Sequence, residues 1–159
     1  FTKVLKGHIA VANSDLSKSI NGEEIDIKAR KFLKRINLDY AHGTGHGVGY
    51  FLNVHEGPQA ISKNNKVKIL EGMILSNEPG YYKKGSYGIR IENLIYVKKF
   101  KKKLFFQNLT LAPIDKDLID FRQLTKVESD YLFKYNLLVY SKISPYLNKS
   151  EKKWLASFI

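Results

Sequence analysis

The spacing of apolar residues separates a helical beginning of the chain from a strand-rich middle. Over residues 1–20 the apolar residues recur at helical spacing. Asn21-Gly22 interrupts this pattern, and residues 23–35 resume it. The sequence therefore predicts two amphipathic helices. Their apolar positions are Phe1, Val4, Leu5, Ile9 and Leu16 in the first, and Ile25, Ala29, Phe32, Leu33 and Ile36 in the second.

The middle of the chain changes to alternating or continuous apolar runs, which are typical of strands. We predict four strands, at residues 50–54, within residues 72–82, at residues 88–93 and at residues 104–112, and Pro79-Gly80 ends the second of them in a turn. The polar stretch at residues 83–86 is a hairpin turn between the second and third strands. Residues 60–71 are predicted to form a loop that turns at Asn64-Asn65.

Helical spacing returns near the end of the chain. Thr125-Lys126-Val127-Glu128 has the form of a capping box, so we expect a helix from there to about residue 139 or 142. Pro145 marks its boundary. Ser150 would cap a last short helix, which holds Trp154, Leu155 and Phe158. Helices at both ends and strands between them predict an α+β fold.

Composition and charge narrow the class of protein. The chain has 159 residues, the length of one domain, and it starts at Phe1, so we expect it to be part of a longer protein. Lysine and arginine number 27 against 15 acidic residues, a net charge of +12. The lysines are scattered, with the densest runs at Lys98-Lys99 and Lys101-Lys102-Lys103. We interpret them as solvated surface and expect no nucleic-acid partner.

Two absences add to this picture. No stretch of about eighteen apolar residues occurs, so we expect no membrane partner. The sequence has no cysteine, which excludes disulfides and thiolate metal sites. Freedom from cysteine fits a reducing compartment, and we expect a cytoplasmic protein.

Candidate chemistry is concentrated in one glycine-rich stretch. Three of the chain's four histidines, His42, His46 and His55, lie within fourteen residues and alternate with glycines. Imidazole is a common metal ligand and a common acid or base near neutral pH. His42 and His46 have the spacing of a helical zinc site, but the glycines between them disfavour a helix and no glutamate follows His42. The pattern indicates a reaction site on a loop.

Two glutamates on the predicted strands extend this set. Glu78 comes at a strand end, directly before the turn Pro79-Gly80. In the strand at 88–93, Arg90 and Glu92 share one face. With His46, the two carboxylates form a nitrogen and oxygen donor set that suits manganese, zinc, cobalt or iron.

Three segments together resemble a known family. Residues 42–58, 78–82 and 88–93 look like the signatures of the pita-bread metallopeptidases, family M24, and most resemble its aminopeptidase P branch. The resemblance implies the pita-bread fold, an antiparallel sheet flanked by helices. It also implies that residues 1–159 are the C-terminal part of a catalytic domain, with residues 109–159 as the extension typical of the long, three-domain form.

The resemblance also implies a ligand set for two divalent metal ions. His46, Glu78 and Glu92 match family ligands, with manganese favoured and zinc or cobalt as alternatives. Two further aspartate ligands are expected upstream of residue 1, so this chain alone should bind metal weakly. Asp15 and Asp26 have the eleven-residue separation of that aspartate pair, but their sequence context differs and we reject them as ligands.

The remaining site residues follow from the same resemblance. His42 and His55 match catalytic histidines that contact substrate, and Glu78 also handles the proton of the metal-bridging water. Arg90 matches an arginine that supports the metal cluster through an aspartate. The implied activity is metal-dependent release of an N-terminal residue before proline, by a parent protein that is a homodimer. Alternatives are a prolidase-like Xaa-Pro dipeptidase and a non-catalytic pita-bread binding module.

Overall fold

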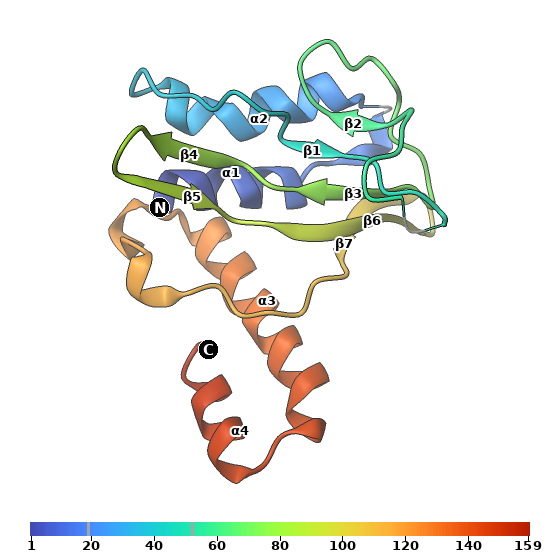
Figure 1. Cartoon of the computed structure of the whole chain (residues 1–159). Coiled ribbons are helices and arrows are strands. Elements are labelled where there is room, and N and C mark those ends of the chain that lie inside the picture. The colour runs from blue at the N-terminus through green and yellow to red at the C-terminus, as the bar shows by residue number, and fades with distance from the viewer. Residues whose placement is uncertain (19, 52) are drawn as a thin grey trace. The chain divides into compact units, whose positions relative to one another are not determined.

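The computed structural model describes residues 1–18, 20–51 and 53–159, which fall into two units. Residues 3–109 form the larger unit, and residues 1–2 with 110–159 form the smaller. In the described chain the larger unit contains the seven strands, β1 to β7, and the helices α1 and α2, and the smaller unit contains the helices α3 and α4 (Figure 1).

The two N-terminal helices form largely where their apolar spacing places them. Helix α1 spans Thr2–Ala12 and α2 spans Gly22–Lys34. Asn21 caps α2 and forms a reciprocal capping box with Glu24, which explains the start of this helix.

The prediction of a single helix over residues 1–20 is wrong. Helix α1 ends at Ala12, and a separate 3-10 turn covers Leu16–Lys18, while residue 19 lies outside the described residues. The polar segment between them makes local hydrogen bonds that compete with the helical pattern. The Ser14 hydroxyl donates to the Ala10 carbonyl, and the Asp15 carboxylate accepts from the Ser17 amide.

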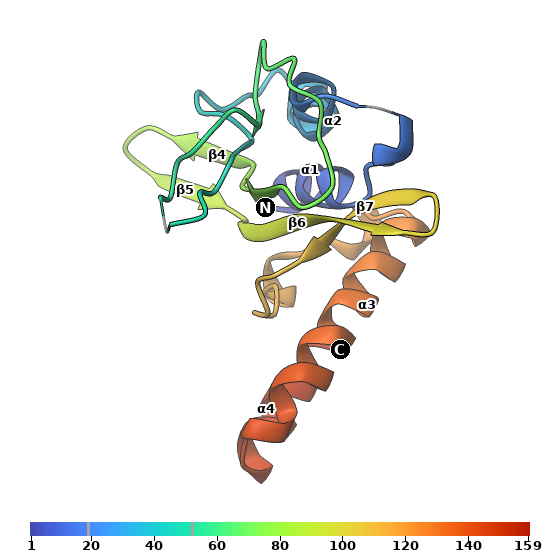
Figure 2. The same cartoon turned by 90° about the vertical axis from the view of Figure 1, so that its right-hand side faces the viewer.

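The strands form an antiparallel arrangement. Strands β3 (Ile74–Asn77), β6 (Asn93–Phe100) and β7 (Lys103–Asn108) make a three-stranded sheet in the order β3-β6-β7. Strands β4 (Gly80–Lys83) and β5 (Tyr87–Arg90) form a hairpin around the predicted turn, and β1 (Gly45–His46) pairs with β2 (Ala60–Ile61). Helices α1 and α2 lie on the same side of the sheet (Figure 2).

The strand predictions are confirmed only in part. The strand predicted to end before Pro79-Gly80 is β3, and the residues after Pro79, which cannot donate to a strand ladder, form the separate strand β4. The strand predicted at residues 88–93 is interrupted, since β5 ends at Arg90 and β6 begins at Asn93. Residues 60–71 are not entirely loop, since β2 lies there. Of the strand predicted at residues 50–54, residues 50, 51, 53 and 54 form no strand, and residue 52 lies outside the described part. Tyr50 and Phe51 are 89% and 87% exposed, so no packing supports a strand.

The core of the larger unit joins its helices to its sheet. Side chains from α1 and α2, from the segments after α1 and before β3, and from strands β2, β3, β6 and β7 meet in one buried cluster. Its members are Val11, Leu16, Ile20, Ile25, Ala29, Ile61, Ile69, Leu75, Ile95, Val97 and Phe106. This cluster fixes β3, whose end carries Glu78, against the helices.

The smaller unit is helical. Thr125 and Glu128 form the predicted capping box at the start of α3 (Lys126–Ile143), and Pro145 lies in a 3-10 turn directly after it. Helix α4 (Lys149–Ala156) begins earlier than predicted, because Asn148 caps it in a box with Glu151 and not Ser150. None of the helices in residues 1–18, 20–51 and 53–159 has the length and apolar character needed to cross a membrane.

Candidate active site

The histidine loop is held against the sheet by the short strand β1. Strand β1 pairs with β2, and Gly47 forms a bridge to β3. A Cβ atom on Gly45 would lie 2.0 Å from the Ser76 carbonyl oxygen, so glycine is needed for this close approach. The contact brings His46 to the end of β3, where Glu78 lies.

Five of the six predicted site residues line one cavity of about 270 Å³. The cavity is formed by the histidine loop together with the ends of β3 and β5. Its lining residues are His42, Gly43, Gly45, His46, His55, Glu78 and Arg90. The structure therefore brings together side chains that are up to 48 positions apart in the sequence, from His42 to Arg90.

Glu78 is the buried acceptor at the centre of this group. Its Oε1 accepts a hydrogen bond from the Ser76 hydroxyl at 2.8 Å and lies 3.3 Å from His46 Nε2. Its Oε2 lies 3.3 Å from Arg90 Nη1. The Ser76 hydroxyl in turn accepts from the His46 amide at 2.9 Å. One serine thus orients both the carboxylate and the histidine backbone.

His46 presents a free nitrogen to this carboxylate. Its Nδ1 lies 3.0 Å from the Gly47 carbonyl, so we assign the proton to Nδ1, where it donates. The lone pair of Nε2 then faces Glu78 Oε1. Two acceptors this close are favourable only with a cation or proton beside them, and ligands of one metal ion lie roughly 3–3.5 Å apart. His46 and Glu78 therefore fit a metal ion.

The fit is incomplete. Within the described residues, no group of three histidine, cysteine, aspartate or glutamate side chains comes together in an arrangement that could hold a metal ion. Glu92 is exposed, follows the end of β5 and does not line the cavity. The structure thus places two of the three predicted ligands together and leaves Glu92 apart from them.

A tyrosine connects His42 to Arg90 at the cavity edge. His42 Nδ1 lies 2.7 Å from the Gly43 carbonyl, which favours the tautomer with the proton on Nδ1. His42 Nε2 then accepts from the Tyr82 hydroxyl at 2.9 Å. Arg90 Nε donates to the same hydroxyl oxygen at 2.7 Å. Tyr82 therefore fixes the orientation of the His42 ring through its acceptor nitrogen, Nε2.

The positive charge of Arg90 interacts with the negative charges of Glu78 and Glu92. The hydrogen bond with Tyr82, together with the negative charges of Glu78 and Glu92, raises the pKa of the Arg90 guanidinium. Arg90 is 45% exposed at the side chain, so it neutralises Glu78 from the solvent side. His55 completes the cavity wall, with its ring centroid 4.0 Å from that of His46.

A buried arginine holds the histidine loop from the helix side. Arg30 on α2 pairs with Asp26 at 2.8 Å and with Asp39 at 2.7 Å. Its other guanidinium bonds go to the backbone carbonyls of Tyr40 at 2.7 Å and His42 at 2.6 Å. Burial alone would lower the pKa of Arg30, but the hydrogen bonds with the two aspartates outweigh it and raise the pKa.

The rejected aspartates occupy positions that fit other roles. Asp26 is 1% exposed and accepts from Arg30 and, at 2.6 Å, from the Thr44 hydroxyl. Thr44 also contacts the Tyr40 hydroxyl, and burial raises the pKa of Tyr40 to about 12. Asp15 caps the 3-10 turn through Ser17. Neither aspartate lines the cavity.

Three residues of this arrangement were not predicted as site members. Ser76 has a signal in the sequence, because it lies two positions before Glu78 at the end of a predicted strand whose alternate residues share a face. Tyr82 lies beyond the turn at Pro79-Gly80, in β4, so this alternation does not reach it. Arg30 carries no such signal. Its contacts reach nine to twelve positions away along the chain, and only the folded loop brings them together.

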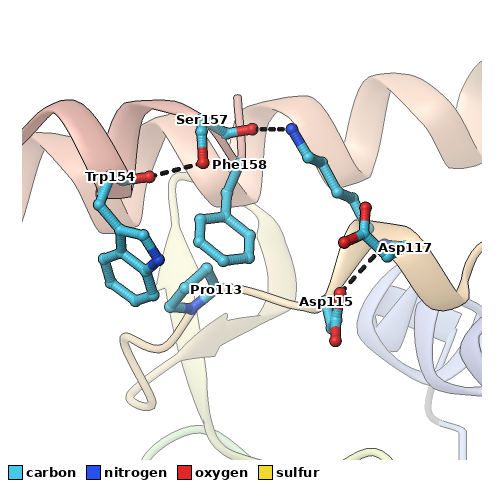
Figure 3. Close-up of a pocket in the computed structure, with 7 residues that line it drawn as sticks. Pro113, Asp115, Asp117, Trp154, Ser157 and Phe158 are labelled. Atoms are coloured by element: carbon cyan, nitrogen blue, oxygen red, sulfur yellow. Dashed lines mark hydrogen bonds between the residues drawn. The ribbon is translucent and has the colours of Figure 1, made fainter.

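A second cavity lies within the smaller unit (Figure 3). It has a volume of about 510 Å³, and Pro113 lies beside the rings of Trp154 and Phe158 in its wall. Lys116 donates to the Ser157 carbonyl, and the Asp115 carboxylate accepts from the Asp117 amide at 3.0 Å. No histidine is among the described residues that line this cavity, so it does not contain the predicted chemistry.

Comparison with known families matches both parts of the chain. Residues 1–99 match metallopeptidase family M24, and residues 102–157 match the C-terminal region of peptidase M24. The chain therefore belongs to metallopeptidase family M24, and its α+β fold is the pita-bread fold of that family. The predicted resemblance is confirmed.

Curated relatives identify the branch of the family to which the chain is similar. It is 45% identical to a probable Xaa-Pro aminopeptidase P of Coprinopsis cinerea, over 98% of this chain and 27% of that protein. It is 43% identical to Xaa-Pro aminopeptidase 1 of Dictyostelium discoideum, over 100% of this chain and 27% of that protein. The chain thus spans about a quarter of the length of these relatives.

Solved structures give the same grouping. The X-prolyl aminopeptidase of Caenorhabditis elegans, described as a cytosolic enzyme with a di-nuclear active site, is 38% identical with a TM-score of 0.88. That match covers 98% of this chain and 27% of the worm enzyme. The prolidase of Pyrococcus furiosus is 28% identical with a TM-score of 0.59, over 68% of this chain and 30% of that enzyme.

Proposed function

We propose that residues 1–159 form the C-terminal part of the catalytic domain of a metal-dependent aminopeptidase. Its substrates would be peptides with proline in second position, cleaved after the N-terminal residue. The observation that carries this proposal is the convergence of three histidines, Glu78 and Arg90 on one cavity. The names of the similar proteins support the choice of substrate. Residues 109–159 would be the C-terminal extension of the long form.

The metal centre would use His46, Glu78 and Glu92 together with aspartates that this chain does not supply. We favour two divalent ions, manganese first and zinc or cobalt as alternatives, because carboxylate ligands dominate the set. A pair of bound divalent ions lowers the pKa of a shared water and polarises the scissile carbonyl. Binding would require Glu92 to approach the cavity from its exposed position after β5.

The side chains of this chain would handle protons and charge around that centre. Glu78 would take the proton of the attacking water, and its hydrogen bond from Ser76 orients it for this task. His42 and His55 would contact the substrate and stabilise the developing oxyanion, for which His42 Nε2 would have to carry a proton in place of the hydrogen bond that it accepts from Tyr82. Arg90 holds the Glu78 carboxylate in place, whereas the sequence resemblance assigned its support to an aspartate.

A prolidase-like dipeptidase is the second candidate, because prolidases share the fold of this chain. The coverage favours an aminopeptidase, since the prolidase match extends over 68% of the chain and the worm aminopeptidase match over 98%. A non-catalytic binding module is the third candidate. It is disfavoured because His46 and Glu78 retain a donor pair that fits a metal.

The proposed activity is tested on a longer protein that contains residues 1–159 and the segment upstream. We expect manganese-dependent cleavage of Xaa-Pro-Xaa tripeptides and weak turnover of Xaa-Pro dipeptides. Faster turnover of dipeptides would favour the prolidase-like alternative. Metal binding without any cleavage before proline would overturn the proposal.

We further propose that this longer protein is a cytoplasmic homodimer. Size-exclusion chromatography with light scattering would test the dimer, and cell fractionation would test the location.

A further inference from the structure

The hairpin of β6 and β7 ends in a strongly basic tip. We use the name basic tip for residues 98–103, which are five lysines and Phe100. All six side chains are exposed. The sequence contains no acidic residue between Asn93 and Ile114, and among the residues that the structure describes no carboxylate forms an ion pair with these lysines. The Asp15 carboxylate interacts electrostatically with Lys103, at the start of β7. The charges of Lys98, Lys99, Lys101 and Lys102 are therefore available to a partner.

The strand register sorts the hairpin into two faces. Lys98 pairs with Phe105 and Phe100 pairs with Lys103, and these side chains share the outer face. Val97 and Phe106 point to the other face and belong to the core. Phe100 is 63% exposed and Phe105 is 36% exposed. The outer face thus combines exposed aromatic rings with ammonium groups.

The tip is attached to the rest of its unit and its turn is strained. The base of β7 is fixed by the Leu104 amide, which donates to the Ser17 hydroxyl at 3.1 Å. Lys101 has a φ of 55°, in the left-handed region where lysine is less stable than glycine. Lys101 therefore adds a positive charge to the turn, although its backbone conformation lowers the stability of the fold. The turn lies at the end of the sheet, where Figure 2 shows the strands projecting from the helices of their unit.

We propose that the basic tip docks on an anionic lipid surface. The Phe100 ring would enter the headgroup region, and the flanking ammonium groups would contact lipid phosphates. Each lysine near such a surface strengthens binding by about fivefold. This proposal differs from the sequence-based expectation of solvated lysines and no membrane partner, because the sequence pattern did not show that Phe100 and Phe105 share their exposed face.

A lipid surface fits the tip better than a nucleic acid does. Lys101 Nζ lies over the Phe100 ring, 5.6 Å from its centroid, so one ring face is covered and less open to a stacked base. The tip has no amide or hydroxyl side chain for reading base edges. A convex hairpin end can enter a soft interface, whereas it offers no groove along which a nucleic-acid backbone could run.

Vesicle sedimentation of the 159-residue chain tests the proposal. We expect binding to phosphatidylcholine vesicles that contain phosphatidylserine, no binding to phosphatidylcholine alone, and weakening as salt rises. Lys101→Gln with Lys102→Gln should reduce binding about tenfold to thirtyfold. The matched control is Lys83→Gln with Lys84→Gln, which removes the same charge from the turn between β4 and β5. Vesicle binding of this control should stay within about twofold of the parent chain, because no exposed ring lies between the lysines of that turn.

The role of the ring is tested separately. Phe100→Ser keeps all five lysines and should lower vesicle binding several-fold. In a Trp154→Phe background, which removes the single tryptophan, Phe100→Trp should show a blue-shifted emission with anionic vesicles only. Equal losses in the two lysine pairs, or unchanged emission of the Phe100→Trp variant on bound vesicles, would overturn the proposal. Displacement of vesicles by a single-stranded oligonucleotide that binds more tightly would also overturn it, in favour of a nucleic acid.

Discussion

At the residue scale, the Arg30 side chain holds the loop of residues 39–42, which leads into the cavity, in its position. Its side chain is 3% exposed and hydrogen-bonds to Asp26, Asp39 and two loop carbonyls. A buried charge is stable only while its partners remain, because an unpaired ion in the interior loses its hydration without compensation. Arg30 therefore links the stability of α2 to the position of His42.

Replacing Arg30 tests this link. Arg30→Met leaves Asp26 buried without its ion-pair partner, and we expect a loss of about 3–5 kcal/mol in the free energy of unfolding. Lys31→Met, on the exposed side of the same helix, should change it by less than about 0.5 kcal/mol. Adding Asp26→Asn to Arg30→Met should recover part of the loss, because it removes the unpaired charge. Urea denaturation of these variants and the parent chain measures the differences, and additive losses would contradict a coupled pair.

His8 gives the larger unit a dependence on pH. This side chain is fully buried, its Nδ1 lies 3.2 Å from the Ile91 carbonyl, and its Nε2 has no hydrogen-bond partner in the part of the chain that the structure describes. Burial lowers the pKa of His8 from 6.5 to about 4, although the hydrogen bond to the Ile91 carbonyl and the nearby backbone of Asn77 act in the opposite direction. The folded chain thus keeps His8 neutral in a range where the unfolded chain protonates it.

The sign of the effect follows from this difference. The stability from neutral His8 is complete above pH 6.5 and is lost as pH falls from 6.5 toward 4, where the folded form also protonates. We expect the chain to lose about 2–3 kcal/mol between pH 7 and about pH 4.5 through His8. His8→Gln should remove this part of the pH dependence. Denaturant midpoints of both proteins at the two pH values provide the measurement, and parallel curves would refute the assignment.

At the element scale, local sequence patterns predicted the structure where local forces decide it. The capping boxes at Asn21 and Thr125 and the helical spacing before and after them account for α2 and α3. The apolar residues near Tyr50 and Phe51 suggested a strand, but the two rings contact each other, stay 89% and 87% exposed, and lie in a turn. The spacing of apolar residues shows that a segment could be buried. Whether it is buried depends on residues that are distant in the sequence and that must pack against it.

The candidate site shows the same division between local and distant causes. The histidines and Glu78 were found from residue type and motif, because their chemistry is visible in the sequence. Ser76 orients Glu78 and His46 only after β1 has come into contact with β3, and Tyr82 reaches His42 only across 40 positions. These contacts result from strand register, which no single segment of the sequence specifies.

The approach of β1 to β3 is itself testable. Gly45→Ala places a methyl group 2.0 Å from the Ser76 carbonyl oxygen, so the strands must separate. We expect a loss of about 1–3 kcal/mol in unfolding free energy, together with weaker metal binding at His46. Gly57→Ala is the control from the same loop, because its Cβ would meet nothing within 4 Å and should change stability by less than about 0.5 kcal/mol. Equal stability of the two variants would show that this close contact is not needed.

At the scale of the whole molecule, charge separates the candidate site from the rest of the surface. The chain carries a net charge of +12, yet the cavity centres on the buried carboxylate of Glu78 beside two close imidazole rings. This carboxylate already forms an ion pair with Arg90. Two divalent cations placed close together repel each other strongly unless several carboxylates neutralise them. The chain by itself supplies too little negative charge for such a pair.

We therefore predict, on the basis of the proposed function, that residues 1–159 alone bind manganese weakly and cleave no peptide at an appreciable rate. His46 and Glu78 are the only predicted ligands that meet in the described structure, and an ion held by two donors keeps most of its water. Calorimetric titration with manganese should show at most one weak site, and Glu78→Gln should abolish it. Two tight sites, or proline-directed cleavage as fast as that of a longer protein, would contradict this prediction. Asp15 and Asp26 would then have to be reconsidered as ligands, which would require Asp26 to leave its ion pair with Arg30.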